Sequence, residues 1–233
     1  MGEWFIELEG EKKDLRLLSE LLNSPNLDVT EEKGAFILCS STFDPALDSN
    51  AIDERSTNLI EVVNGAAKLY SRRYQGVTAK AVVRIDEDGK RLKYVTLTAR
   101  ARDFTLTARG RDDLVESWFS IAQADEHVTR ALTLYGSLEH NWKNLYMLLE
   151  VIEADIGGEG ALCGKGWVSK KKIKGFKHTA NSFSAIGRDA RHGHAKLQPP
   201  KTPMLLQDAR MLIRSLLRQW LESKEPISVS QVT

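Results

Sequence analysis

The stretch VTAKAVVRI, residues 77–85, carries the clearest secondary-structure signal in the chain and indicates its fold class. Its odd-numbered residues are apolar and most of its even-numbered residues are polar, which is the two-residue period of a half-buried β-strand. The sequence DEDG at residues 86–89 is typical of a turn, so residues 91–98 are expected to return antiparallel as the second strand of a hairpin. We therefore predict a mostly antiparallel sheet.

On the N-terminal side of this hairpin, short apolar runs alternate with longer stretches of helical spacing. The strands are expected at residues 4–8 and 35–40, and the helices at residues 14–23 and 52–71, and one more short strand is expected after the hairpin at residues 104–108. This order predicts an α+β domain over residues 1–110, with a mostly antiparallel sheet and two helices packed on one of its faces.

Beyond Gly110 only helical spacing remains, so we place a domain boundary near Gly110–Arg111. Residues 111–233 are predicted to form an all-helical bundle without strands. The expected helices are residues 113–122, 127–138, 142–156, 167–183 and 203–223, the last with Thr202 as its N-cap.

Nothing in the sequence is typical of secretion or membrane insertion. The N-terminus has no basic region followed by an apolar run, and the longest apolar stretches fall short of the roughly 20 residues that span a bilayer. The two cysteines, Cys39 and Cys163, lie in different predicted domains and do not suggest a disulfide scaffold. We expect a cytoplasmic protein that does not associate with membranes.

Positive charge is concentrated in one segment of the C-terminal half. Residues 165–196 contain nine lysines and arginines and one acid, a balance of +8, whereas the whole chain carries +1. Clustered cations attract phosphates, so this segment is a candidate nucleic-acid interface. The alternative is a helix face that is simply solvated.

The basic helix is followed by the sequence GRDARHGH, residues 187–194. Histidine exchanges a proton near neutral pH, and arginine stays charged and holds phosphate oxygens through paired donors. Arg188 with His192 or His194 therefore fits phosphoryl transfer, in which the arginine balances transition-state charge and the histidine moves the proton. Zinc ligation is disfavoured because no Cys or Glu stands at ligand spacing, so no metal is expected. Exposed loop residues without a function are the remaining alternative.

These residues give the C-terminal half a resemblance to HEPN domains, a helical family in which many members are metal-independent ribonucleases. The family motif is an arginine, usually followed by a polar residue, with four to six residues before a histidine. Here Asp189 follows Arg188, and five residues separate Arg188 from His194. Only three separate Arg188 from His192, yet His192-Gly193 is similar to the His-Gly ending common in the family. The resemblance covers residues 113–225 and leaves the choice of histidine open.

The resemblance implies a homodimer with both loops facing one cleft, and RNA cleavage by attack of the ribose 2′-hydroxyl, in bacterial defence or stress response. Arg188 would bind the scissile phosphate and His192 or His194 would transfer the proton. Asn181, which has the form of a helix C-cap, and Asp189 are further candidates. The candidate nucleic-acid ligands are Lys170, Lys171, Lys172, Lys174 and Arg191.

Two other functions fit the same sequence. The helical half could be a non-catalytic module that binds nucleic acid or a partner protein; the short spacing to His192 favours this, and the doubled histidine favours catalysis. Alternatively, residues 1–110 could bind a small ligand and control the helical half. Residues 1–110 contain no Gly-rich phosphate loop, nucleophile elbow or carboxylate pair, so we assign no chemistry to them. We expect no cofactor.

Overall fold

The computed structural model describes residues 3–86, 88, 90–95, 114–137, 139–191 and 198–225. The chain divides into two compact units, residues 1–120, here called the sheet unit, and residues 121–233, the helical unit. The predicted fold class is confirmed, because an antiparallel sheet with helices is followed by helices. The expected boundary at Gly110–Arg111 and the expected strand at residues 104–108 lie outside the described residues.

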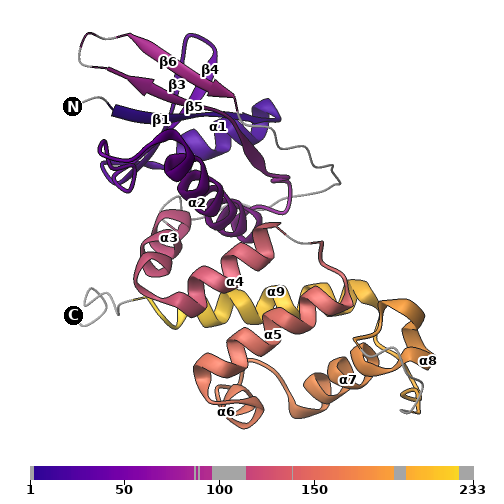
Figure 1. Cartoon of the computed structure of the whole chain (residues 1–233). Helices are drawn as coiled ribbons and strands as arrows, with labels where there is room; N and C mark the ends of the chain where they lie inside the picture. The colour runs from indigo at the N-terminus through magenta and orange to yellow at the C-terminus, as the bar shows by residue number, and fades with distance from the viewer. Residues whose placement is uncertain are drawn as a thin grey trace, which may run out of the picture. The chain divides into compact units, whose positions relative to one another are not determined.

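The sheet unit is built on six strands whose pairings are all antiparallel (Figure 1). Their order is β2-β3-β4-β1-β5-β6, so the N-terminal strand lies inside the sheet between β4 and β5. Helix α1 packs against β1 and β3, and α2 packs against β5. The elements are β1 (Glu3–Gly10), α1 (Lys12–Leu21), β2 (Asn23–Ser24), β3 (Leu27–Glu32), β4 (Ala35–Ser40), α2 (Ser49–Tyr70), β5 (Val77–Ile85) and β6 (Arg91–Val95).

Strands β2 and β3 are absent from the predicted elements. Leu27 and Val29 are buried, but Glu31 and Glu32 end β3 with exposed charge, so the strand lacks a long apolar alternation. The turn between β3 and β4 consists of Lys33-Gly34. Both have positive φ angles, 51° and 84°, as a two-residue hairpin turn requires.

A β-bulge in β5 changes which of its residues face the helices. Glu7 on β1 pairs with Ala81, but its neighbour Leu8 pairs with Ala79, so Lys80 is an extra residue in the strand. Because side chains alternate along a strand, this insertion exchanges the two faces between the first and the second half of β5.

The residues after the bulge therefore leave the helix-covered face. Val82 pairs with Ile6, and both are completely buried on the side of the helices. Val83 pairs with Phe5 on the opposite side, and Ile85 follows it there. The uninterrupted alternation of residues 77–85 predicts one face for all five odd-numbered residues, and this expectation is wrong.

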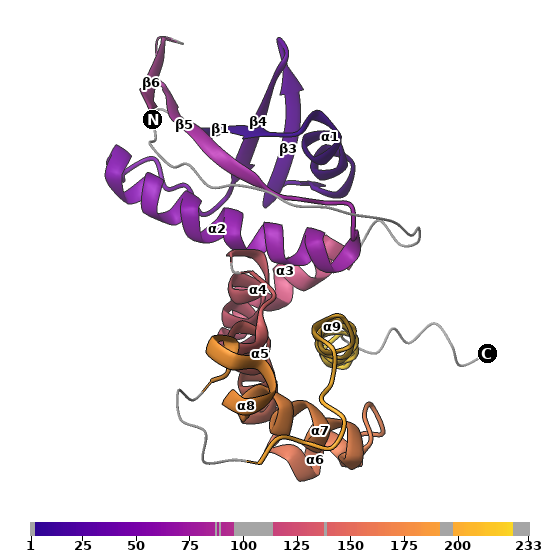
Figure 2. The same cartoon turned by 90° about the vertical axis from the view of Figure 1, so that its right-hand side faces the viewer.

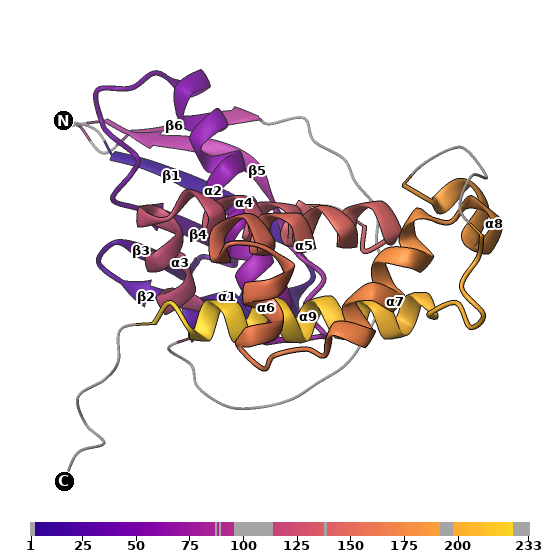
Figure 3. The ribbon, with the colours of Figure 1, turned by 90° about the horizontal axis from the view of Figure 1, so that it is seen from below.

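In the helical unit, α5 contacts α4, α6, α7 and α9 (Figures 2 and 3). Its buried residues include Trp142, Leu145, Leu149 and Ile152, which recur every three or four residues and form one apolar stripe. No strand occurs among the residues described after 113, and no helix of the described chain is long and apolar enough to cross a bilayer. The helices are α3 (Leu114–Ala124), which spans the division between the units, α4 (Glu126–Ser137), α5 (Trp142–Ile156), α6 (Glu159–Gly164), α7 (Lys170–Asn181), α8 (Phe183–Ile186) and α9 (Leu206–Glu222), with a 3-10 segment at Gly187–Asp189.

The last helix starts later than the sequence predicts. Leu205, not Thr202, occupies the N-cap position of α9 and has an extended backbone. The N–H of Met204 donates to Thr179 Oγ1 at 3.0 Å, so the chain is attached to the end of α7 before α9 begins.

An ion-pair network holds the C-terminal end of α9. Lys224 Nζ donates to Asp125 Oδ2 at 2.6 Å and to Asp155 Oδ1 at 3.0 Å, and Trp220 Nε1 donates to Asp155 Oδ2 at 2.7 Å. Burial opposes the charge on Lys224, but these hydrogen bonds outweigh it and raise its pKa. The network ties α9 to the start of α4 and to the end of α5.

Asn64 performs a similar task in the sheet unit, where it joins α2 to the start of β5. Its Nδ2 donates to the Val77 carbonyl at 2.9 Å, and its Oδ1 accepts from the Val77 N–H at 3.0 Å and from the Tyr74 hydroxyl at 2.6 Å. The Asn64 amide is buried, so its donor and acceptor atoms cannot form hydrogen bonds with water instead.

We expect Asn64→Ala to lower the free energy of unfolding by about 2–4 kcal/mol, because it leaves buried donors and acceptors without partners. Tyr74→Phe removes one of the three hydrogen bonds and should cost about 1 kcal/mol. Urea denaturation followed by circular dichroism measures both. Asn58→Ala, on the exposed side of α2, is the control; a loss as small as that of Asn58→Ala would contradict the assignment.

Candidate nucleic-acid interface

Helix α7 carries the basic cluster and is fixed on α5 by apolar contacts. Ile173, Phe176 and Ala180 are fully buried, and the Phe176 ring lies 5.8 Å from that of Trp142 and 6.0 Å from that of Tyr146. The residues of the first turn of α7 face solvent. Its exposed cations, which form no ion pair with any described residue, are Lys170, Lys171, Lys172 and Lys174.

Three of these lysines occupy the first turn of α7, where they do not stabilise the helix. Ser169 caps the helix by accepting from the Lys172 N–H at 3.3 Å. The N-terminus of a helix carries partial positive charge, so cations in its first turn are unfavourable and anions are favourable. Lysines and exposed N–H groups at one helix end form a suitable site for a phosphate.

Lys177 belongs to the same segment but has a structural role. Its Nζ donates to Glu153 Oε2 at 2.9 Å and to Glu159 Oε2 at 3.0 Å, and so joins α7 to α5 and α6. Burial disfavours the charged form, but the two carboxylates outweigh it and raise the pKa of Lys177. One of the nine cations of the segment is thus used inside the bundle.

Arg191 is also held by α5. Its Nη2 donates to Glu150 Oε1 at 2.8 Å, and its guanidinium lies 4.4 Å from the centre of the Tyr146 ring. Its backbone N–H donates to the carbonyl of Ala180 at 2.9 Å. Arg191 therefore fixes the chain next to the end of α7, immediately before His192.

Arg188 has a different environment, although it lies only three residues away. It is exposed and forms no ion pair with any residue that the structure describes, and the same holds for Asp189. The preceding residue, Gly187, has φ 61° and ψ −138°, a conformation that is essentially restricted to glycine. The turn thus presents Arg188 to solvent between two fixed points, α7 and Arg191.

The C-terminal end of α7 carries buried polar atoms without a described partner. Ser182, not Asn181 as expected, occupies the C-cap position of α7, and Asn181 is the last residue of the helix. Asn181 Nδ2 donates to the Lys177 carbonyl at 2.9 Å and lies 3.5 Å from the Tyr146 hydroxyl. Asn181 Oδ1 and Ser182 Oγ are buried and accept or donate no hydrogen bond within the described chain. Such atoms are uncommon at helix ends that serve packing alone.

The structure thus brings Asn181, Arg188, Asp189 and Arg191 together at one end of α7, and four lysines lie along the same helix. His192 and His194 lie outside the described residues. Among the residues that are described, no group of three His, Cys, Asp or Glu side chains is placed to hold a metal ion.

Sequence reasoning missed Tyr146 and Glu150, which hold Arg191. They stand four residues apart, one turn of α5, and more than forty residues before Arg191. Their spacing matches a helix surface, but no local pattern connects them to Arg191. The packing of α7 on α5 brings these residues together.

Comparison with known proteins finds no family model, no curated protein and no solved structure that matches this chain.

The different environments of the two arginines lead to a stability prediction. Arg191→Ala should lower the free energy of unfolding by about 1 kcal/mol, because it removes an ion pair and a cation–π contact that are both partly exposed. Arg188→Ala should change it by less than about 0.5 kcal/mol. Urea denaturation of the two variants provides the test, and equal effects would show that Arg191 does not hold the turn.

Proposed function

We propose that the helical unit binds RNA along α7 and cleaves it at the following turn as a metal-independent endoribonuclease. The observation that carries the proposal is the contrast between paired and unpaired cations. Lys177 and Arg191 are neutralised by carboxylates of the bundle, whereas Arg188 and four lysines of α7 are exposed without a described acidic partner. These remaining cations are available for phosphates.

In the proposed site the lysines of α7 bind the RNA backbone, and the turn that carries Arg188 binds the phosphate to be cleaved. Helix α7 has 12 residues and is therefore about 18 Å long, so a strand that touches both ends follows it for several nucleotides. Lysine contacts to phosphate give affinity without sequence preference. Arg188 would hold the scissile phosphate and Arg191 would keep the turn in place.

The proposed reaction is an internal transfer of the phosphate. A loop histidine, His192 or His194, takes the proton of the ribose 2′-hydroxyl, whose oxygen then attacks the adjacent phosphorus. Arg188 stabilises the charge that gathers on the phosphate oxygens. The bond to the 5′-oxygen breaks, this oxygen receives a proton, and the products end in a 2′,3′-cyclic phosphate and a 5′-hydroxyl. The resemblance to HEPN domains supports this scheme and a homodimer.

A second candidate function is binding without cleavage. The lysines of α7 serve a scaffold that holds nucleic acid or an acidic partner as well as they serve an enzyme, and that function needs no histidine. The two functions differ in the role of the loop, so binding and cleavage are tested by separate variants.

For binding, we expect RNA affinity to fall steeply with salt, and Lys170→Glu, Lys171→Glu and Lys172→Glu together to weaken it for all sequences. Loss of three phosphate contacts should reduce the salt slope, d log K/d log [salt], by about 2 for a single strand. Fluorescence anisotropy with labelled RNA measures both. Lys12→Glu, Lys33→Glu and Lys90→Glu in the sheet unit change the net charge equally and are the control. Equal losses in the two triple variants would mean that α7 is only a solvated face.

For cleavage, we expect activity on mixed RNAs in the presence of EDTA, with cyclic or 3′-phosphate ends, and DNA bound but not cut, because DNA lacks the 2′-hydroxyl. Arg188→Ala and the substitution of the catalytic histidine should each lower the rate about 10²–10⁴-fold, with binding retained. Comparing His192→Ala with His194→Ala identifies that histidine. Full activity of the variant lacking Arg188, His192 and His194 would rule out the enzyme and leave the binding module.

A further inference from the structure

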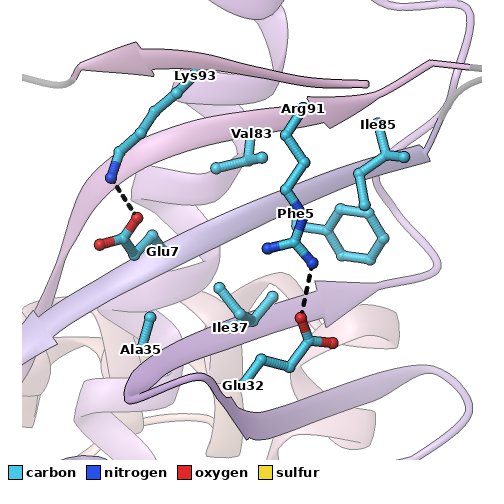
Figure 4. A pocket seen from close by; sticks show the side chains of 9 residues that line it. All are labelled: Phe5, Glu7, Glu32, Ala35, Ile37, Val83, Ile85, Arg91 and Lys93. Carbon is cyan, nitrogen blue, oxygen red and sulfur yellow. Dashed lines mark hydrogen bonds and ion pairs between the residues drawn. The ribbon is translucent and has the colours of Figure 1, made fainter. Parts of the chain in front are cut away.

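The face of the sheet that the helices leave uncovered contains a pocket (Figure 4). Its volume is about 220 Å³. Its apolar lining comes from three strands, β1, β4 and β5, and two pairs of charged residues complete it. The lining residues are Phe5, Glu7, Glu32, Ala35, Ile37, Val83, Ile85, Arg91 and Lys93.

An ion pair shows that this face is concave. Arg91 Nη2 on β6 donates to Glu32 Oε2 on β3 at 2.8 Å, although β4, β1 and β5 lie between these strands. In a flat sheet, four strand spacings would separate them by about 19 Å, which is farther than the two side chains reach together. The sheet therefore curves into a trough, and this ion pair crosses it, as Figure 4 shows.

The bulge at Lys80 makes the floor of the trough apolar. It turns Val83 and Ile85 away from the helices and towards Phe5, and Ile37 joins them from β4. In an antiparallel sheet, the face that does not pack on the core is ordinarily polar. An apolar patch with charged residues at its rim is typical of a binding site.

One wall of the trough has an excess of positive charge. Glu7 is buried and its carboxylate accepts from Lys80 Nζ at 2.6 Å and from Lys93 Nζ. Hydrogen bonds, the largest from Lys80 and the next from Lys93, lower the pKa of Glu7 despite its burial, so the Glu7 carboxylate is ionised. Of the charged residues that line the pocket, both cations, Arg91 and Lys93, lie on β6, whereas the carboxylates Glu7 and Glu32 lie on β1 and β3. Both lysines are about half exposed and have donors to spare.

We propose that this trough binds a small organic anion with a compact apolar body. The apolar body would lie on Phe5, Ile37 and Val83, and the anionic group would lie between Arg91 and Lys93. These two residues are two apart on β6, so their Cα atoms are about 7 Å apart on the same face. The pocket is smaller than the ~300–1,000 Å³ typical for drug-sized ligands, which indicates a ligand with one ring or a short chain.

The anion can enter without disturbing the core. Arg91 and Glu32 are both about half exposed, and an exposed ion pair contributes little to stability. A ligand carboxylate or phosphate can therefore replace Glu32 as the partner of Arg91. The better-buried pairs of Glu7 stay in place and keep Lys93 directed into the trough.

A series of probes of matched shape tests the charge preference. Benzoate, benzamide and benzylamine are titrated against the full-length protein, and acetate serves as the anion without an apolar body. Amide chemical shifts in ¹H–¹⁵N spectra locate the binding. We expect benzoate to shift residues of β1, β4, β5 and β6 and to bind about ten-fold more tightly than benzamide. Acetate and benzylamine should cause no shifts there. Equal binding of benzylamine and benzoate, or no binding of benzoate, overturns the proposal.

Two pairs of variants test the location. Ala35→Phe fills the pocket and should abolish benzoate binding, whereas Ala46→Phe at an exposed position should not. Arg91→Gln should weaken the affinity for benzoate about ten-fold with little effect on the affinity for benzamide. Arg73 is also exposed, and Arg73→Gln should change neither affinity. Circular dichroism checks folding, and the Arg91→Gln comparison stands if Ala35→Phe does not fold. Retained benzoate affinity in Arg91→Gln would contradict the proposal. A second outcome would also contradict it: the protein does not bind benzoate but self-associates, and Arg91→Gln abolishes the self-association. The trough would then be occupied by a second copy of the chain.

Discussion

Folding removes ionic side chains from water in both units, and a charge that leaves water needs a partner. Glu7 is held by two lysines of β5 and β6, Lys177 by two carboxylates, and Lys224 by two aspartates. Asp14 of α1 is buried and accepts from the N–H groups of residues 75 and 76. Each of these arrangements joins elements that are distant in sequence. The pairing of buried charge thus connects strands in one unit and helices in the other.

The same requirement separates structural ions from those left for a ligand. Lysines and arginines look alike in sequence, but a cation that is already neutralised attracts a phosphate less than one that is not. Arg191 and Arg188 are the clearest example, because one is stacked and paired and the other is exposed. The function proposed for α7 and its loop rests on this difference, and whether the loop cleaves or only binds depends on its histidines.

The sequence predicts the elements with a regular period and misses what depends on contacts between distant residues. The hairpin of β5 and β6, the helices of the sheet unit and the stripe of α5 follow from spacing alone. The sequence does not predict strand β3 because its apolar alternation is limited to Leu27 and Val29 and it ends in two glutamates. The sequence does not predict the bulge because Lys80 fits the polar and apolar alternation of β5, and only the pairing of β5 with β1 reveals it. At the candidate site the loop residues are evident from sequence, whereas Tyr146 and Glu150, which hold Arg191, become evident only when α7 packs on α5.

The three lysines in the first turn of α7 also have a thermodynamic consequence. Any anion that binds the folded helix there, including sulfate or phosphate from a buffer, stabilises the folded state by mass action, since the unfolded chain no longer gathers these groups at one helix end. Folding stability and anion affinity are then linked quantities, and each must be reported at a stated buffer composition. Under the proposed function, inorganic phosphate competes with nucleic acid for the same helix end, and affinities measured in phosphate buffer are then expected to be lower than those in a buffer without multivalent anions.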